Sequence, residues 1–155
     1  DIVLNPGMVI SGAIDEAASE VELLREEAKD VVLKVIIESG ALKSPELIRR
    51  ASLVSMFAGA DFVKTSTGKI DVAATPEAAF IMCHAIKDWH TKTGQKVCYK
   101  PAGGVSTTDE AVQHYTLVKE ILGEQWLNNE SFRFGASRLA NNLLTNIMGE
   151  EVKYF

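Results

Sequence analysis

The sequence of 155 residues is short of several residue types and patterns. Its two cysteines, Cys83 and Cys98, form no CxxC pair, so we expect neither a disulfide framework nor a zinc site, and a reducing cytoplasm suits the chain. It has no apolar run of about 18 residues and no basic segment leading into an apolar one, so we expect no transmembrane helix and no secretory leader. The three histidines, His84, His90 and His114, lack metal-ligand spacing. We therefore expect no metal and no cofactor.

Positive charge is also in short supply, because 16 Lys and Arg residues stand against 21 Asp and Glu residues, a formal net charge of −5. An acidic protein does not attract the phosphates of a nucleic acid or an anionic membrane surface, so we expect neither partner. The nucleotide-binding patterns GxxxxGKS/T and GxGxxG are missing, since Gly68-Lys69 is followed by Ile70. We expect small-molecule ligands and one domain over residues 1–155, whose 46% hydrophobic composition suffices for a single core.

Strand-like and helix-like segments alternate along the chain. Short runs rich in β-branched or aromatic residues predict strands at residues 1–5, 31–38, 61–66, 96–102 and 132–137. Helical patterns lie between them, and three have recognisable starts. Ser44-Pro45 and Thr75-Pro76 each place an N-cap before a proline, and the run Thr107-Thr108-Asp109-Glu110 reads as a capping box.

This alternation predicts an α/β fold with a parallel sheet covered by helices. Two architectures compete at this point. One is a five-stranded doubly wound parallel sheet, which the length of 155 residues favours. The other is a (β/α)8 TIM barrel of which the chain holds five βα units. The placement of the lysines favours the barrel.

Three consecutive predicted strands each contain one lysine: Lys34, Lys64 and Lys100. Lysine is rare in strands and rarely buried, so a single one would be a snorkelling or edge residue, whereas three at corresponding places indicate a site. Ammonium groups crowded into a partly dry site lower each other's pKa, and a neutral lysine can attack a carbonyl carbon to form a Schiff base. Asp1 falls on the neighbouring strand, where it could relay a proton or simply pair with a lysine. The sequence leaves these two roles of Asp1 open.

Glycines and hydroxyl residues follow the same strands. The loops "STGK" at 66–69, "AGGVST" at 102–107 and "GASR" at 135–138 offer closely spaced backbone N–H groups, and Ser137 is the expected N-cap of the last helix. Any one of these glycines could merely turn the chain. Three such loops at one end of the sheet predict an anion site, as loops and a helix start often form in barrels.

Four of these stretches, "DFVKTSTGK", "YKPAGGVST", "LKVIIESGAL" and "FRFGASRL", together resemble the deoxyribose-phosphate aldolases, class I aldolases with a (β/α)8 barrel. The resemblance implies reversible cleavage of 2-deoxy-D-ribose 5-phosphate to D-glyceraldehyde 3-phosphate and acetaldehyde. It implies that Lys64 forms the Schiff base, that Lys100 lowers its pKa, and that Asp1 transfers protons. Lys34 would support this site electrostatically. The residues implied in phosphate binding are Gly68, Lys69, Gly103, Gly104, Gly135 and Ser137.

Two further residues follow from the same resemblance. Arg138 stands where a second serine is common, and Ser106 stands where an arginine is frequent, so we count Arg138 among the phosphate-binding residues. Tyr154 matches a tyrosine in a mobile tail that assists proton transfer, although a tyrosine this near the end of a chain can equally be an ordinary surface residue.

The resemblance begins at the fourth strand of the barrel. We expect the chain to be the C-terminal part of the barrel, strands 4 to 8, without its first three βα units. Three explanations are open: another chain supplies the missing segment, the chain is a truncated or cleaved product, or it is a half-barrel that oligomerises. We expect a homo-oligomer under each of them. The alternative function is a non-catalytic phosphosugar-binding or structural half-barrel.

Overall fold

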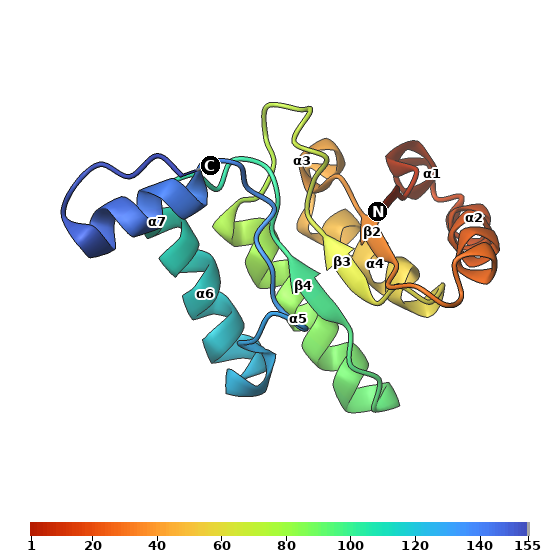
Figure 1. Ribbon diagram of the computed structural model, residues 1–155. Helices are drawn as coiled ribbons and strands as arrows, with labels where there is room; N and C mark the ends of the chain where they lie inside the picture. The colour runs from red at the N-terminus through yellow and green to blue at the C-terminus, as the bar shows by residue number, and fades with distance from the viewer. Residues whose placement is uncertain (155) are drawn as a thin grey trace.

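Four of the predicted strand segments form a parallel sheet in the computed structural model, which describes residues 1–154 (Figure 1). They are shorter than expected, because regular pairing is confined to the middle of each apolar run. The strands are β1 (Ile2–Val3), β2 (Lys34–Ile36), β3 (Phe62–Lys64) and β4 (Cys98–Lys100).

The strand order is β1-β2-β3-β4, the same as the order along the chain. A doubly wound sheet of the flavodoxin type reverses direction at a switch point, in the order 2-1-3-4-5, whereas successive neighbours are what a βα barrel requires. The alternative of a doubly wound sheet is therefore wrong. The chain forms part of a (β/α)8 barrel, and the helices lie on the outer side of the sheet.

The expected fifth strand at 132–137 is not a regular strand. Two isolated parallel bridges, Tyr99 with Phe132 and Ala102 with Gly135, hold this segment beside β4. The amide N–H groups of Arg133 and Gly135 donate to carbonyls of the β4 region, at 3.3 and 2.8 Å. The segment lies at the edge of the described sheet and pairs on one side only. It runs parallel to β4 as predicted, but its hydrogen bonds to β4 do not form a continuous ladder.

Seven α-helices and a short 3-10 helix surround the sheet among residues 1–154. The caps predicted at Thr75 and Thr107 are confirmed, whereas Ser44 occupies the N-cap position of its helix without a capping hydrogen bond from its side chain. Thr75 accepts a hydrogen bond from the N–H of Ala78, and Thr107 and Glu110 form the reciprocal capping box. Among these residues no helix is long and apolar enough to cross a membrane. The helices are α1 (Pro6–Ser11), α2 (Ile14–Glu27), α3 (Ser39–Leu42), α4 (Pro45–Phe57), α5 (Pro76–Thr93), α6 (Thr108–Leu122), η1 (Glu124–Trp126) and α7 (Leu139–Met148).

The core lies between the outer face of the sheet and the helices. Val35, Val63 and Tyr99, at the same level of β2, β3 and β4, are each 0% exposed. Because side chains alternate along a strand, their neighbours in sequence point to the opposite, inner face. That inner face carries the lysines.

The Tyr99 ring stacks on Phe132 with an interplanar angle of 3°, and its hydroxyl lies 3.5 Å from Nδ1 of His114 on α6. His114 is 2% exposed, and burial lowers its pKa, although the nearby Glu110 carboxylate acts in the opposite direction. His114 is thus one of the few polar groups in the core. Its neutral form is the one that packs there.

We predict that His114 makes folding pH-dependent. Because its pKa is lower in the folded chain, its contribution is complete above the unfolded pKa of about 6.5 and is lost as the pH falls through the folded pKa. Urea denaturation at successive pH values should show wild-type stability falling on acidification more steeply than that of His114→Gln. Parallel pH profiles for the two proteins would contradict the prediction.

Candidate active site

One carboxylate, that of Asp1, contacts three lysines on the inner face of the sheet. Its Oδ1 lies 3.1 Å from Nζ of Lys34. Its Oδ2 lies 3.0 Å from Nζ of Lys64 and 3.3 Å from Nζ of Lys100. The lysine side chains are 13–18% exposed and the Asp1 side chain is 29% exposed, so the cluster is partly shielded from water.

The sheet register explains why these side chains meet. Lys64 pairs with Lys100 across β3 and β4, whereas Lys34 pairs with Phe62 and lies two residues further back. Asp1 directly precedes Ile2, the partner of Val35, and therefore stands level with Lys34. Positions two residues apart share a face of a strand, so all four charged residues point to the same side. The structure thus brings together the four residues predicted from the sequence.

The surroundings lower the pKa values of two of these lysines. Burial lowers the pKa of Lys64, the charge of Lys34 lowers it further, and the Glu38 carboxylate partly offsets both. Burial also lowers the pKa of Lys100, followed by the charges of Lys64, Lys34 and Arg133. A lowered pKa leaves a larger fraction of neutral amine near pH 7, the form that attacks a carbonyl. Lys34, expected only to support the site, is the cation with the largest influence on Lys64.

Sequence reasoning missed two residues beside this cluster. Arg133 lies over the Phe62 ring, 5.2 Å from its centroid, and Lys34 lies 6.0 Å from the same centroid. Glu38 is only 7% exposed and binds the loop after β3. For Glu38, a charged residue at the end of an apolar run was the signal, because charged residues are rarely buried without a partner. Arg133 is exposed, and its only signal was its place between two phenylalanines in "FRFGAS".

A second feature is a cavity of about 350 Å³ beside the lysines. It contains six of the seven residues expected to bind phosphate, and its glycines are structurally required. A Cβ on Gly103, where φ is +80°, would come within 2.7 Å of the Ala73 Cβ, and one on Gly135 within 3.3 Å of Cε of Lys100. The cavity therefore adjoins the lysine cluster. Its lining is Gly68, Gly103, Gly104, Val105, Ser106, Gly135, Ala136, Ser137 and Arg138.

One prediction at this cavity needs correction and another stays a prediction. Lys69 is exposed and does not line the cavity, although its neighbour Gly68 does, and its part in phosphate binding stays a prediction. Ser137 is not the N-cap of α7: the cap position belongs to Arg138, whose side chain makes no capping hydrogen bond. The helix begins one residue later than expected, so the Ser137 hydroxyl lies a position too early to cap it. The hydroxyl instead lines the cavity.

Tyr154 lies apart from the site in this structure. It is 71% exposed, and its backbone N–H donates to Oδ1 of Asn141 at 3.0 Å. No hydrogen bond between its side chain and the lysines is found within residues 1–154. Its role in proton transfer stays a prediction.

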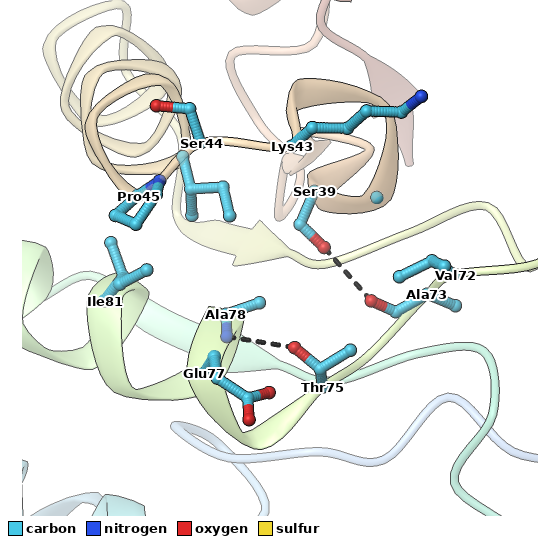
Figure 2. Close-up of a pocket in the computed structure, with 12 residues that line it drawn as sticks. Ser39, Lys43, Ser44, Pro45, Val72, Ala73, Thr75, Glu77, Ala78 and Ile81 are labelled. Atoms are coloured by element: carbon cyan, nitrogen blue, oxygen red, sulfur yellow. Dashed lines mark hydrogen bonds between the residues drawn. The ribbon is translucent and has the colours of Figure 1, made fainter.

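A further hollow of about 400 Å³ lies on the outer side of the barrel wall, between the starts of α4 and α5 (Figure 2). It is lined largely by apolar atoms, including those of Ile48 and Ile81, and by none of the three lysines of the site. In Figure 2, Ser39 donates to the carbonyl oxygen of Ala73 across one end of it. This hollow marks where α3 packs on the loop between β3 and α5.

The fold and the site define a class: a βα-barrel protein with a lysine–carboxylate cluster next to a glycine-lined cavity. Comparison with known proteins narrows this class, because residues 2–125 match the DeoC/LacD family aldolase model. The chain belongs to the DeoC/LacD family of aldolases, and the resemblance seen in the sequence is confirmed.

Individual relatives agree with this. A Mus musculus protein named deoxyribose-phosphate aldolase is 44% identical over 92% of this chain and 45% of its own length. A Caenorhabditis elegans protein, provisionally named deoxyribose-phosphate aldolase, is 45% identical over 95% of this chain and 48% of its own length. The chain thus spans about half the length of these relatives.

A solved structure shows the same fold. The crystal structure of a Toxoplasma gondii ME49 protein, provisionally named deoxyribose-phosphate aldolase, matches with a TM-score of 0.79 and 20% identity. The match covers 95% of this chain and 57% of that one. This likeness, at low identity, supports the partial barrel.

We predict that Lys34 controls the reactivity of Lys64. Its positive charge lowers the pKa of Lys64, so Lys34→Met should raise that pKa and move the midpoint of Lys64 acylation by acetic anhydride to higher pH. Mass spectrometry of the acylated peptide measures this midpoint. Lys87→Met, which removes an exposed charge on α5, should leave the midpoint unchanged. An unchanged or lower midpoint in Lys34→Met would refute the prediction.

Proposed function

We propose that the protein is a deoxyribose-phosphate aldolase, a class I carbon–carbon lyase. The observation that carries the proposal is the convergence of Lys34, Lys64 and Lys100 on the Asp1 carboxylate beside a glycine-lined cavity. A Schiff base forms from a neutral lysine, and charged groups beside that lysine can transfer the protons that the reaction moves. A phosphorylated substrate also needs an anion site that its phosphate can reach while its aldehyde lies at the lysine.

In the proposed reaction, the Lys64 amine attacks the C1 aldehyde of 2-deoxy-D-ribose 5-phosphate. Loss of water gives a protonated Schiff base whose nitrogen accepts electrons. The C3 hydroxyl loses a proton, the C2–C3 bond breaks, and its electron pair forms an enamine while D-glyceraldehyde 3-phosphate leaves. The enamine takes up a proton at C2, and water releases acetaldehyde and restores Lys64. No electrons are gained or lost overall.

The neighbours of Lys64 have proposed roles in these proton transfers. Lys64 and Lys100 both donate to the same oxygen of Asp1, Oδ2, at 3.0 and 3.3 Å, so a proton can pass between this carboxylate and either amine. Lys100 also adds positive charge near the nucleophile. We assign Lys34 to holding Asp1 and lowering the pKa of Lys64 rather than to contact with the substrate.

The cavity next to Lys100 is the proposed phosphate site. At Gly103, Gly104 and Gly135 an anion can approach the backbone closely because no Cβ intervenes, and Arg138 adds a charge at the rim. The N–H groups of Gly103 and Gly135 donate to the carbonyls of Gly135 and Pro101, so we assign the binding N–H among these three glycines to Gly104. Gly68 and Ser137 complete the lining, and Lys69 reaches the site only if its exposed side chain folds inward. We further propose a cytoplasmic homo-oligomer whose barrel is closed in the active form, since an open βα barrel leaves strand edges unpaired.

Borohydride trapping tests the proposed function. Incubation of the complete natural polypeptide with acetaldehyde and sodium borohydride should add a two-carbon ethyl group to Lys64, detected by peptide mapping. Lys64→Arg should abolish the adduct, and Lys87→Arg should retain it. Absence of an adduct on Lys64, or one that survives in Lys64→Arg, would rule out the proposed nucleophile.

Arg138 provides a separate test of the phosphate site. Arg138→Leu should raise KM for deoxyribose 5-phosphate by about tenfold, the loss expected for one charge-assisted hydrogen bond, and the effect should shrink in high salt. Trapping by acetaldehyde, which has no phosphate, should be unaffected. Lys87→Leu serves as the control for removal of one positive charge. Equal effects of Arg138→Leu on both reactions would exclude a specific phosphate contact.

A further inference from the structure

The turn between β2 and α3 has an unusual residue at its centre. Glu38 is buried, at 7% exposed, and adopts a left-handed backbone conformation with φ of +51° and ψ of +58°. Such a conformation is strained for a residue with a long side chain and persists only where its surroundings hold it. Glu38 occupies the N-cap position of α3, yet its side chain does not cap that helix. The carboxylate is directed to another partner.

That partner is the loop after β3. The Glu38 Oε2 accepts a hydrogen bond from the Thr67 hydroxyl at 2.6 Å, and Oε1 accepts one from the Thr67 backbone N–H at 3.3 Å. The Thr67 hydroxyl in turn accepts a hydrogen bond from the backbone N–H of Lys69 at 3.1 Å. One buried carboxylate therefore fixes the loop from Thr67 to Lys69, including Gly68 in the cavity lining.

The backbone on either side of Glu38 binds the same segment. The N–H of Ile37 donates to the carbonyl of Lys64 at 3.0 Å, and the N–H of Ser39 donates to that of Thr65 at 2.9 Å. Ile37 and Ser39 thus bind the proposed nucleophile Lys64 and the residue after it, while Glu38 between them binds the loop that leads to the cavity.

Helix α3 also holds the far end of this loop. The Ser39 hydroxyl donates to the Ala73 carbonyl at 3.1 Å, as Figure 2 shows. A Cβ on Gly40 would lie 1.9 Å from the carbonyl oxygen of Val72, so α3 meets the loop backbone to backbone. The loop from Thr65 to Ala73 is consequently clamped at both ends by Glu38 and the first residues of α3.

We propose that Glu38 is a positioning residue for the aldolase reaction: its carboxylate orients the Thr67–Lys69 loop relative to Lys64 and so aligns the phosphate of the substrate with the nucleophile. This inference rests on the proposed function. It assigns no contact between Glu38 and the substrate. In this left-handed conformation the carboxylate binds Thr67 and does not cap α3, so the strained backbone accompanies the loop contact.

Glu38 has an electrostatic effect as well as a geometric one. Its negative charge raises the pKa of Lys64, against the burial and the Lys34 charge that lower it. Removing the charge should therefore increase the fraction of neutral Lys64 at a given pH. Loss of the hydrogen bonds should loosen the loop and weaken the binding of phosphate. Loss of the Glu38 carboxylate should therefore favour the reaction of Lys64 with an aldehyde but weaken the binding of phosphate, and the two effects are measured separately.

The experiment compares Glu38→Gln with the wild type in the complete natural polypeptide. We expect the pH midpoint of acetaldehyde trapping on Lys64 to move to lower pH, because acetaldehyde makes no use of the phosphate site. We expect KM for deoxyribose 5-phosphate to rise by about tenfold, because the amide keeps one acceptor oxygen but loses the charge and the second acceptor for the Thr67 donors. Glu120→Gln, an exposed carboxylate on α6, should change neither.

A second variant guards against simple misfolding. Glu38→Gly removes the same carboxylate but adopts a positive φ without strain, so it should remain as stable as the wild type in urea while showing the raised KM. If wild-type Lys64 is trapped but neither variant moves the pH midpoint or KM, the positioning role is refuted and the proposed function stands. Failure to trap wild-type Lys64 refutes the proposed function itself. A stability loss in Glu38→Gly with unchanged KM would make Glu38 merely structural.

Discussion

The shared contact of three ammonium groups with the Asp1 carboxylate is the constraint on which the rest of the site depends. Without a central anion, three partly buried lysines on adjacent strands would repel one another and seek water. One carboxylate cannot neutralise three cations, so the cluster keeps a positive excess. Burial first, and then the neighbouring positive charges, hold the pKa values of Lys64 and Lys100 below the ordinary lysine value. The backbone must be rigid enough to maintain this arrangement.

Parallel strands in consecutive order supply that rigidity. Alternation along each strand separates the two functions of the sheet: Val35, Val63 and Tyr99 pack against helices, and the intervening residues face the interior. A slip of one residue in the register would send Lys64 into the apolar core and Val63 into the site. The buried outer face therefore fixes the position of the inner face that carries the lysines, and the same strand pairing sets both the packing of the core and the geometry of the lysines.

Most of this site could be predicted from the sequence, because lysines within strands and glycines after strands are local patterns. The barrel order of the strands needed the resemblance as well, since length alone favoured a doubly wound sheet. What could not be predicted depends on contacts between distant residues. Glu38 looked like the end of an apolar run, and its hydrogen bond to Thr67 spans 29 positions. The N-cap of α7 is Arg138 rather than Ser137, a shift of one residue that the sequence pattern did not predict.

The separation of the lysines from the anion cavity has a physical reason under the proposed reaction. A phosphate dianion bound directly by Lys64 would favour its protonated form and so suppress attack on the aldehyde. Backbone N–H groups around Gly103 and Gly104, with Arg138 at the rim, can hold the same dianion without drawing on the reactive amine. Lys100 adjoins both regions, since its Nζ lies 3.3 Å from Oδ2 of Asp1 and a Cβ on Gly135 would lie 3.3 Å from its Cε. Binding and carbon chemistry can then share one end of the barrel because each uses different groups.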